Sequence, residues 1–168
     1  MIEPDGAAGP RRAVFAALLL LSGACGGETQ GGSRPSAPAE ERLIIATDSG
    51  RVELRVDVAD EPAERQQGLM GVQKLEQDRG MVFLPDEAPS RQRFWMKNTL
   101  IPLSIAWWDD QGQIVAIQDM EPCEAEPCEI YDPGVDSVGA VEVNQGFFDE
   151  RGVEVGDTVE LIAGTAAR

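Results

Sequence analysis

The sequence contains no histidine, only two lysines (Lys74 and Lys97) and three cysteines. Without histidine the chain cannot build a Ser-His-Asp or Cys-His catalytic set or a His-ligated metal site. Positive charge is also scarce, because 14 Lys and Arg stand against 30 Asp and Glu, which gives a net charge of −16 and a pI of about 4.2. Such a chain repels phosphate backbones, so we expect no nucleic-acid partner.

Long apolar runs are missing as well. The longest one, residues 13–21, has nine residues and follows Arg11 and Arg12. A helix needs about 20 apolar residues to cross a bilayer, whereas a signal-peptide core is of this shorter length. We therefore interpret residues 1–24 as a signal peptide.

The end of this segment resembles the lipobox of bacterial lipoproteins, in which a cysteine becomes the lipid-bearing N-terminus. The run LLSGAC at 20–25 places small residues before Cys25, although Ser22 stands where the lipobox usually has an aliphatic residue. The alternative is an ordinary secretory signal with a chance cysteine. We predict lipidation of Cys25, which makes the membrane a partner and places the protein on the extracytoplasmic face of a bacterial membrane.

The rest of the chain divides by composition. Residues 25–41 hold the cysteine and a Gly-, Ser- and Pro-rich stretch without large apolar side chains, which predicts a flexible linker. Residues 42–164 carry the apolar patterning of one folded domain, and 165–168 form a short tail.

Within the domain, apolar and polar residues alternate, as is typical of half-buried strands. Residues 51–58 alternate without exception and follow Leu43–Thr47 across a Ser49-Gly50 turn, which predicts a hairpin. We expect further strands at 81–84, 92–96, 103–108, 113–120, 138–143 and 158–162. A short helix from an Asp60 cap to Gly68 and a helical turn at 147–151 complete the set. The fold class is therefore mainly β: a single antiparallel sandwich or barrel-like domain with one or two short helices.

The segment 94–108, FWMKNTLIPLSIAWW, is the richest in aromatic residues. Alternation places Leu103, Ile105 and Trp107 on one face, which is core. The other face has an exposed-looking set of side chains that can stack on a ligand or bind an anionic or carbonyl group. These ligand-binding candidates are Trp95, Lys97, Asn98, Ser104 and Trp108. The plainer interpretation of Lys97 is an ion pair with a surface carboxylate.

The run FWMKNTLIPLSIA at 94–106 resembles the hallmark of a bacterial and archaeal family known as domain of unknown function 192. Three other segments agree with it: ERQQGLM (64–70), RGMVF (79–83), and VEVNQG (141–146) followed by VGD (155–157). The resemblance covers about residues 52–161 and implies an all-β sandwich, often exported, with no established activity. The family usually has Asp at the position of Ser104, so any acid or base that relatives place there is missing.

The remaining cysteines, Cys123 and Cys128, form a pair once Cys25 is set aside. We predict a structural disulfide, since disulfides persist in exported proteins. A redox-active or metal-binding pair is the alternative, and the nearby Glu121, Glu124, Glu126 and Glu129 disfavour it by suppressing the reactive thiolate. We interpret these acids as a solvated rim, not as a calcium site.

The leading hypothesis for function is a lipid-anchored envelope protein whose domain is a non-catalytic binding module for a small molecule, a glycan or a protein. The first alternative is an enzyme that acts on envelope glycans or small molecules through carboxylates, which need no histidine. The second is a copper carrier using Met70, Met81, Met96 and Met120, although core packing explains these methionines as well. No cofactor or resident metal is expected.

Overall fold

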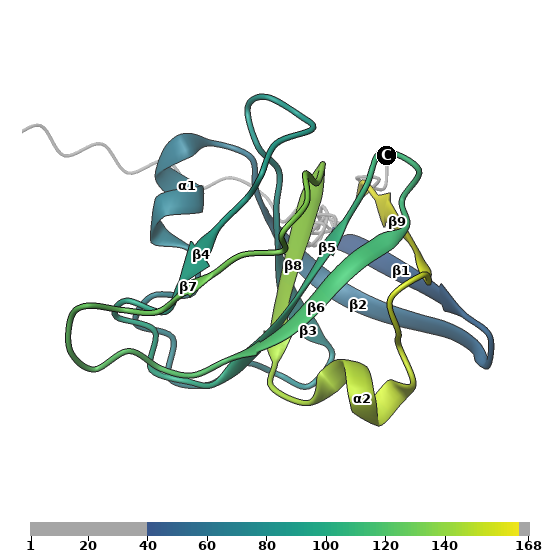
Figure 1. The fold of residues 1–168 in the computed structure, drawn as a ribbon. Coiled ribbons are helices and arrows are strands. Elements are labelled where there is room, and N and C mark those ends of the chain that lie inside the picture. The colour runs from purple at the N-terminus through teal and green to yellow at the C-terminus, as the bar shows by residue number, and fades with distance from the viewer. Residues whose placement is uncertain (1–39, 165–168) are drawn as a thin grey trace, which may run out of the picture. The chain divides into compact units, whose positions relative to one another are not determined.

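The computed structural model describes residues 40–164, so Cys25, the signal peptide, nearly all of the linker and the tail lie outside the described residues. The described part consists of nine strands and two short helices (Figure 1). In chain order these are β1 (Glu41–Thr47), β2 (Gly50–Ala59), α1 (Pro62–Gln67), β3 (Arg79–Phe83), β4 (Phe94–Trp95), β5 (Leu103–Trp108), β6 (Ile114–Met120), β7 (Ile130–Tyr131), β8 (Gly139–Asn144), α2 (Phe147–Arg151) and β9 (Thr158–Ile162). The mainly β fold predicted from the sequence is confirmed. Neither of these two helices is long and apolar enough to cross a membrane.

Seven strands form one curled sheet in the order β6-β5-β8-β3-β2-β1-β9. Its neighbours are antiparallel except for β2 and β3, which run parallel. The purely antiparallel sheet expected from the sequence is therefore wrong at this pair, because residues 60–78, which include α1, carry the chain back before β3 begins. Gln113 and Thr158 bridge β6 to β9 at one end, so the sheet curls into a half-barrel.

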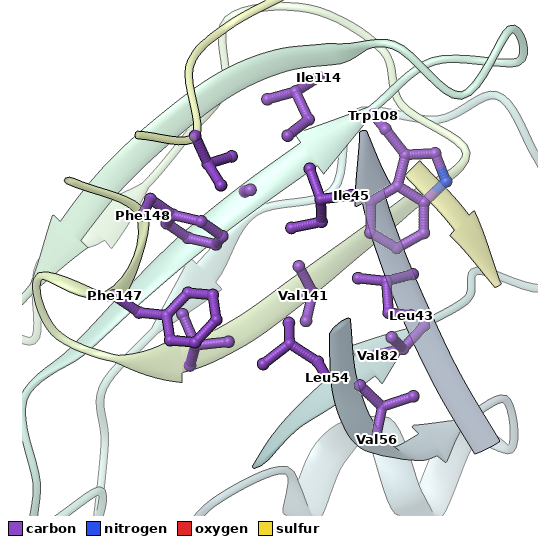
Figure 2. Close-up of a cluster of buried hydrophobic side chains, with 13 residues drawn as sticks. Leu43, Ile45, Leu54, Val56, Val82, Trp108, Ile114, Val141, Phe147 and Phe148 are labelled. Carbon is purple, nitrogen blue, oxygen red and sulfur yellow. The ribbon is translucent and has the colours of Figure 1, made fainter. Parts of the chain in front are cut away.

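The concave side of the sheet surrounds what we call the first core. Alternation along β2 places Leu54 and Val56 there, and Leu43 and Ile45 of β1 lie beside them. The full set is Leu43, Ile45, Leu54, Val56, Val82, Ala106, Trp108, Ile114, Val141, Val143, Phe147, Phe148 and Val153. In Figure 2, Phe147 and Phe148 of α2 lie at one end of this cluster and Trp108 lies at the other. The short helix therefore closes this side of the sheet with two aromatic rings.

The opposite face of the sheet carries a second core. It comprises Leu69, Met96, Leu103, Ile105, Trp107, Met120, Tyr131 and Ala140. Irregular segments cover it: the connection after α1, which supplies Leu69, and the β4–β7 pair, which supplies Tyr131. All six residues of β5 are buried and alternate between the two cores, apart from Ser104. A strand covered on both faces is expected to be apolar throughout.

β4 and β7 form a separate two-stranded sheet, with Phe94 opposite Tyr131 and Trp95 opposite Ile130. The sequence did not predict β7, since a two-residue strand gives no measurable alternation. The loop before β7 is closed by the predicted disulfide between Cys123 and Cys128, with an S–S distance of 2.09 Å.

α1 begins one residue later than predicted. Its N-cap is Glu61, not Asp60, because β2 extends to Ala59. The Glu61 N–H donates to the Glu64 carboxylate (3.3 Å), and the Gly68 N–H donates to the Glu64 carbonyl (2.8 Å) at the other end. No residue of α1 is buried. In Figure 1, α1 stands beside β4 and far from α2.

Candidate functional site

Three of the five predicted ligand-binding residues lie together at the end of β4 and directly after it: Trp95, Lys97 and Asn98. Trp95 is 47% exposed, and the Lys97 ammonium lies 5.4 Å from the centroid of its ring. Lys97 also forms an ion pair with Glu126, which lowers the pKa of the Glu126 carboxyl through their hydrogen bond. The plainer interpretation of Lys97 as the partner of a surface carboxylate therefore describes its contact.

Asn98 shapes the turn that follows. Its φ of 58° is in the left-handed region, which asparagine tolerates better than most residues. Its carbonyl accepts a hydrogen bond from the Gly71 N–H (2.9 Å), and the Thr99 N–H donates to the Met96 carbonyl (3.1 Å). These backbone hydrogen bonds fix the turn and the backbone of Thr99.

The other two predicted residues lie elsewhere. The Ser104 hydroxyl donates to the Asp119 carboxylate and accepts from the Gly146 N–H (2.9 Å), at the start of α2. Trp108 is 6% exposed and belongs to the first core. The five side chains therefore do not converge. The alternation of β5 side chains between the two faces was predicted correctly. The face on which Trp95 lies does not follow from it, because β4 belongs to a different sheet.

An open cleft of about 540 Å³ lies beside Trp95. We call it the α1–β4 cleft, because Arg65 of α1 and Phe94 and Trp95 of β4 form its walls together with Phe83 at the end of β3. Its other lining residues are Pro85, Asp86, Glu87, Ser90, Gln92 and Arg93. Most ligand sites are of this kind, with aromatic walls and a few polar groups.

A small hollow of about 30 Å³ adjoins the cleft. The two spaces share Arg65, Phe83, Phe94 and Trp95 as lining residues, so the hollow is a recess behind the cleft's aromatic wall. Its other lining residues are Gln66, Gln67, Gly68, Leu69, Met70, Thr99 and Glu142. The hollow therefore brings a hydroxyl and a carboxyl to one small space.

Glu142 is the most unusual of these residues. It is only 5% exposed and lies on β8 between Met81 of β3 and Ile105 of β5. No hydrogen bond joins its carboxyl to another residue in 40–164, and burial raises its pKa from 4.5 to about 8. Every fully buried side-chain oxygen or nitrogen in that range has a partner. The unpartnered carboxyl oxygens therefore keep a small accessible area, and the hollow is the space they face.

The two arginines of the cleft differ. The Arg65 guanidinium is occupied, since it donates to the Leu84 carbonyl (2.9 Å) and the Asp60 carbonyl and pairs with Asp86. Arg93 is exposed, and no carboxylate of the described domain lies within 4 Å of it. Arg93 thus places a positive charge at the rim that forms no ion pair, although it is near enough to Asp132 to help lower the pKa of that carboxyl.

Arg93, Thr99 and Glu142 were not predicted from the sequence as site residues. Val141 and Val143 on either side of Glu142 face the first core, so alternation places Glu142 on the opposite face of the sheet, but it does not show what covers that face. The signal that was available is the position of a lone acid inside the otherwise apolar run 138–143.

The alternative metal interpretations have little support in the geometry. Met96 and Met120 are buried in the second core, where their side chains are packing groups. Among residues 40–164, no group of three or more Cys, Asp or Glu side chains is placed to hold a metal ion.

Comparisons with known proteins agree with this fold. A family model for DUF192, described as "Uncharacterized ACR", matches residues 44–161. A crystal structure from Sinorhizobium meliloti 1021, described as a "putative transcription regulator", is 34% identical, with a TM-score of 0.67 over 73% of this chain and 94% of that one. A protein of unknown function from Novosphingobium aromaticivorans DSM 12444 is 26% identical, with a TM-score of 0.67 over 81% of this chain and 99% of that one. No curated protein matches the chain.

Proposed function

The chain belongs to the DUF192 family, and we propose that it is an envelope-anchored binding protein whose ligand site is the α1–β4 cleft. One observation carries the proposal: an open cleft with an aromatic wall adjoins a hollow lined by Glu142, a mostly buried carboxyl that no residue of the described domain hydrogen-bonds. Pockets that combine apolar walls with a few polar groups of shifted pKa are typical of functional sites.

Binding is favoured over catalysis by the arrangement of the acids. Asp86, Glu87 and Glu142 line the two spaces. Glycoside hydrolysis needs two carboxyls that flank the scissile bond. Glu142 lies in a hollow of about 30 Å³, which is too small for a sugar ring, and Asp86 is held by Arg65. The site is therefore better suited to holding one end of a ligand than to cleaving it.

The test of this proposal is a titration of isotope-labelled full-length protein with a library of small amines, sugars and carboxylic acids, followed by NMR. Binding compounds should perturb the Trp95 indole N–H signal. Arg93→Ala should lower the affinity for compounds that carry an acidic group by about tenfold. Arg51→Ala is the matched control, because Arg51 is also exposed and has no carboxylate within 4 Å in the described domain. Compounds that bind only at other surfaces would refute the assignment of the cleft.

The place of action is the extracytoplasmic face of a membrane, to which a lipid on Cys25 anchors the domain. The lipobox-like run supports this, and so does the disulfide, since disulfides persist in oxidising compartments. The net charge of −16 opposes nucleic-acid binding, so the description of the S. meliloti relative is not transferred.

Labelling with a radioactive fatty acid tests the anchor in the producing bacterium. The wild-type chain should incorporate label and sediment with membranes, whereas Cys25→Ser should do neither. The double variant Cys123→Ser/Cys128→Ser should still be labelled. Label that survives Cys25→Ser would show that Cys25 is not the anchor.

A further inference from the structure

The carboxyl of Glu142 has no hydrogen-bond partner among residues 40–164. Its neighbours across the sheet, Met81 and Ile105, are apolar and offer it no hydrogen bond. Its oxygens keep a small accessible area, so water or a ligand group in the hollow can satisfy them, and without either the mostly buried carboxyl would destabilise the fold. A group that enters the hollow from the cleft would supply the missing partner.

The size of the hollow limits what that group is. A water molecule needs roughly 10–15 Å³ of probe-occupied volume, so about 30 Å³ holds one small polar group. A ring or a phosphate does not fit. An acidic group would meet a second carboxyl in a poorly hydrated space, which like-charge repulsion disfavours.

An ammonium group satisfies the acceptors that are present. It carries three N–H donors and a positive charge, and Glu142 and Thr99, whose side chains offer carboxyl and hydroxyl acceptors, both line the hollow. Hydrogen bonds between ionised partners are roughly twice as strong as neutral ones.

The aromatic wall favours the same class of ligand. Phe83, Phe94 and Trp95 line the hollow and the cleft alike, and aromatic ring faces attract cations. The Trp95 ring already has the Lys97 ammonium 5.4 Å from its centroid. The net charge of −16 adds a field that concentrates cations near the protein.

On the basis of the proposed cleft function, we propose that the ligand carries a primary amine and that its ammonium group binds in the hollow as the counter-ion of Glu142. The remainder of the ligand lies along the α1–β4 cleft, where Arg93 is available to an acidic group.

The ion pair requires that Glu142 lose its proton when the ligand binds. Arg65 is the other charged side chain lining the hollow, and Asp86 already compensates it. Burial raises the pKa of Glu142 to about 8, while an alkylammonium stays charged throughout pH 6–9. Only the ionised fraction of Glu142 is competent for this pairing, so the apparent affinity for an amine should rise roughly 50-fold between pH 6 and pH 8 and then level off.

The experiment compares n-butylamine with 1-butanol, which has the same length but no charge. Each probe is titrated into labelled full-length protein at pH 6, 7, 8 and 9, and the NMR signals of Trp95 and Thr99 report binding. We expect the amine to bind more tightly as pH rises to 8, and the alcohol to show no such rise. Glu142→Gln should weaken amine binding at pH 8 by at least tenfold and abolish its pH dependence. Glu154→Gln, at an exposed acid that lines neither the hollow nor the cleft, is the matched control and should change neither.

Several results would overturn this inference. Equal affinities for amine and alcohol, or amine binding that does not change with pH in the wild type, would do so without any variant having to fold. Amine binding that Glu142→Gln spares and that Glu87→Gln, at an exposed acid of the cleft, abolishes would be assigned to the rim instead. If neither probe moves these signals while library compounds do, the amine inference fails and the cleft function stands. If the library fails there too, both proposals fail.

Discussion

The two faces of the curled sheet have the same alternating strands, but they are closed in different ways. On the concave face, α2 places Phe147 and Phe148 over the first core, and both rings are buried. On the opposite face, irregular segments cover the second core and leave a cleft at its edge, where Phe94 is only half-buried. A continuous cover yields a closed core, whereas an irregular cover leaves space that a ligand can use.

Strand β8 shows the contrast within three residues. Val141 and Val143 face the first core, and Glu142 between them faces the hollow beside the second. A mostly buried carboxyl without a hydrogen-bond partner in the protein lowers the free energy of unfolding. Proteins tend to keep destabilising groups of this kind at functional sites. The concave face therefore contributes mainly to stability, and the contrast supports the proposed binding role of the other face.

The largest effect expected is the loss of Phe148. Phe148→Ala should lower the free energy of unfolding by about 3–5 kcal/mol, since it removes a fully buried ring and leaves a cavity in the first core. Phe94→Ala should cost clearly less, because the half-buried Phe94 ring already borders an open cleft. Urea denaturation of both variants measures the difference.

Val155→Ala is the control, because Val155 is exposed and its truncation should hardly change the free energy of unfolding. If Phe148→Ala and Phe94→Ala lower the free energy of unfolding by the same amount, the second core is packed as completely as the first. The contrast between the two faces would then be wrong.

The second prediction concerns Glu142 and pH. Its pKa is about 8 in the folded protein and near 4.5 when unfolded, so between these values the folded state holds a proton that the unfolded state has released. The free energy of unfolding therefore falls as pH rises from 4.5 to 8, by up to ~1.4 kcal/mol per pH unit. Glu142→Gln removes this loss, so at pH 8 the variant should be more stable than the wild type by on the order of 3–4 kcal/mol.

Urea titrations at pH 5, 6, 7 and 8 test this, and only the difference between variant and wild type is used, because many other acids also titrate. The free energy of unfolding of Glu87→Gln should change with pH in the same way as that of the wild type. If the curve for Glu142→Gln also runs parallel to the wild-type curve, the Glu142 carboxyl is not desolvated in the folded protein.

Much of the fold was predictable because β-strands report their buried faces through alternation. The strands 103–108 and 158–162 and the helix 147–151 have the predicted bounds. The parallel β2–β3 pair and the β4–β7 pair were not predicted, since both depend on where connections carry the chain. Alternation describes a strand and its two faces but not which strand lies beside it.

The candidate site was predicted only in part, for the same reason. Trp95 and Lys97 lie at or next to the cleft, while Ser104 and Trp108 lie toward the other face of the sheet. Glu142 was not predicted as a site residue, because the irregular cover of the second face leaves no periodic signal in the sequence. The roles of the five candidates in binding stay predictions.

The smallest effect on stability is expected at Trp95. Trp95→Ala should lower the free energy of unfolding by only ~1 kcal/mol, since about half of the side chain is exposed and large losses come from buried groups. Ile130→Ala is the matched control, because Ile130 lies directly opposite Trp95 in the β4–β7 pair, is 51% exposed and does not line the cleft. Both variants should melt close to the wild type, but only Trp95→Ala should lose the binding of n-butylamine. If the two variants bind alike, the second face has no aromatic contact with the ligand; if Trp95→Ala unfolds the protein, Trp95 belongs to the core.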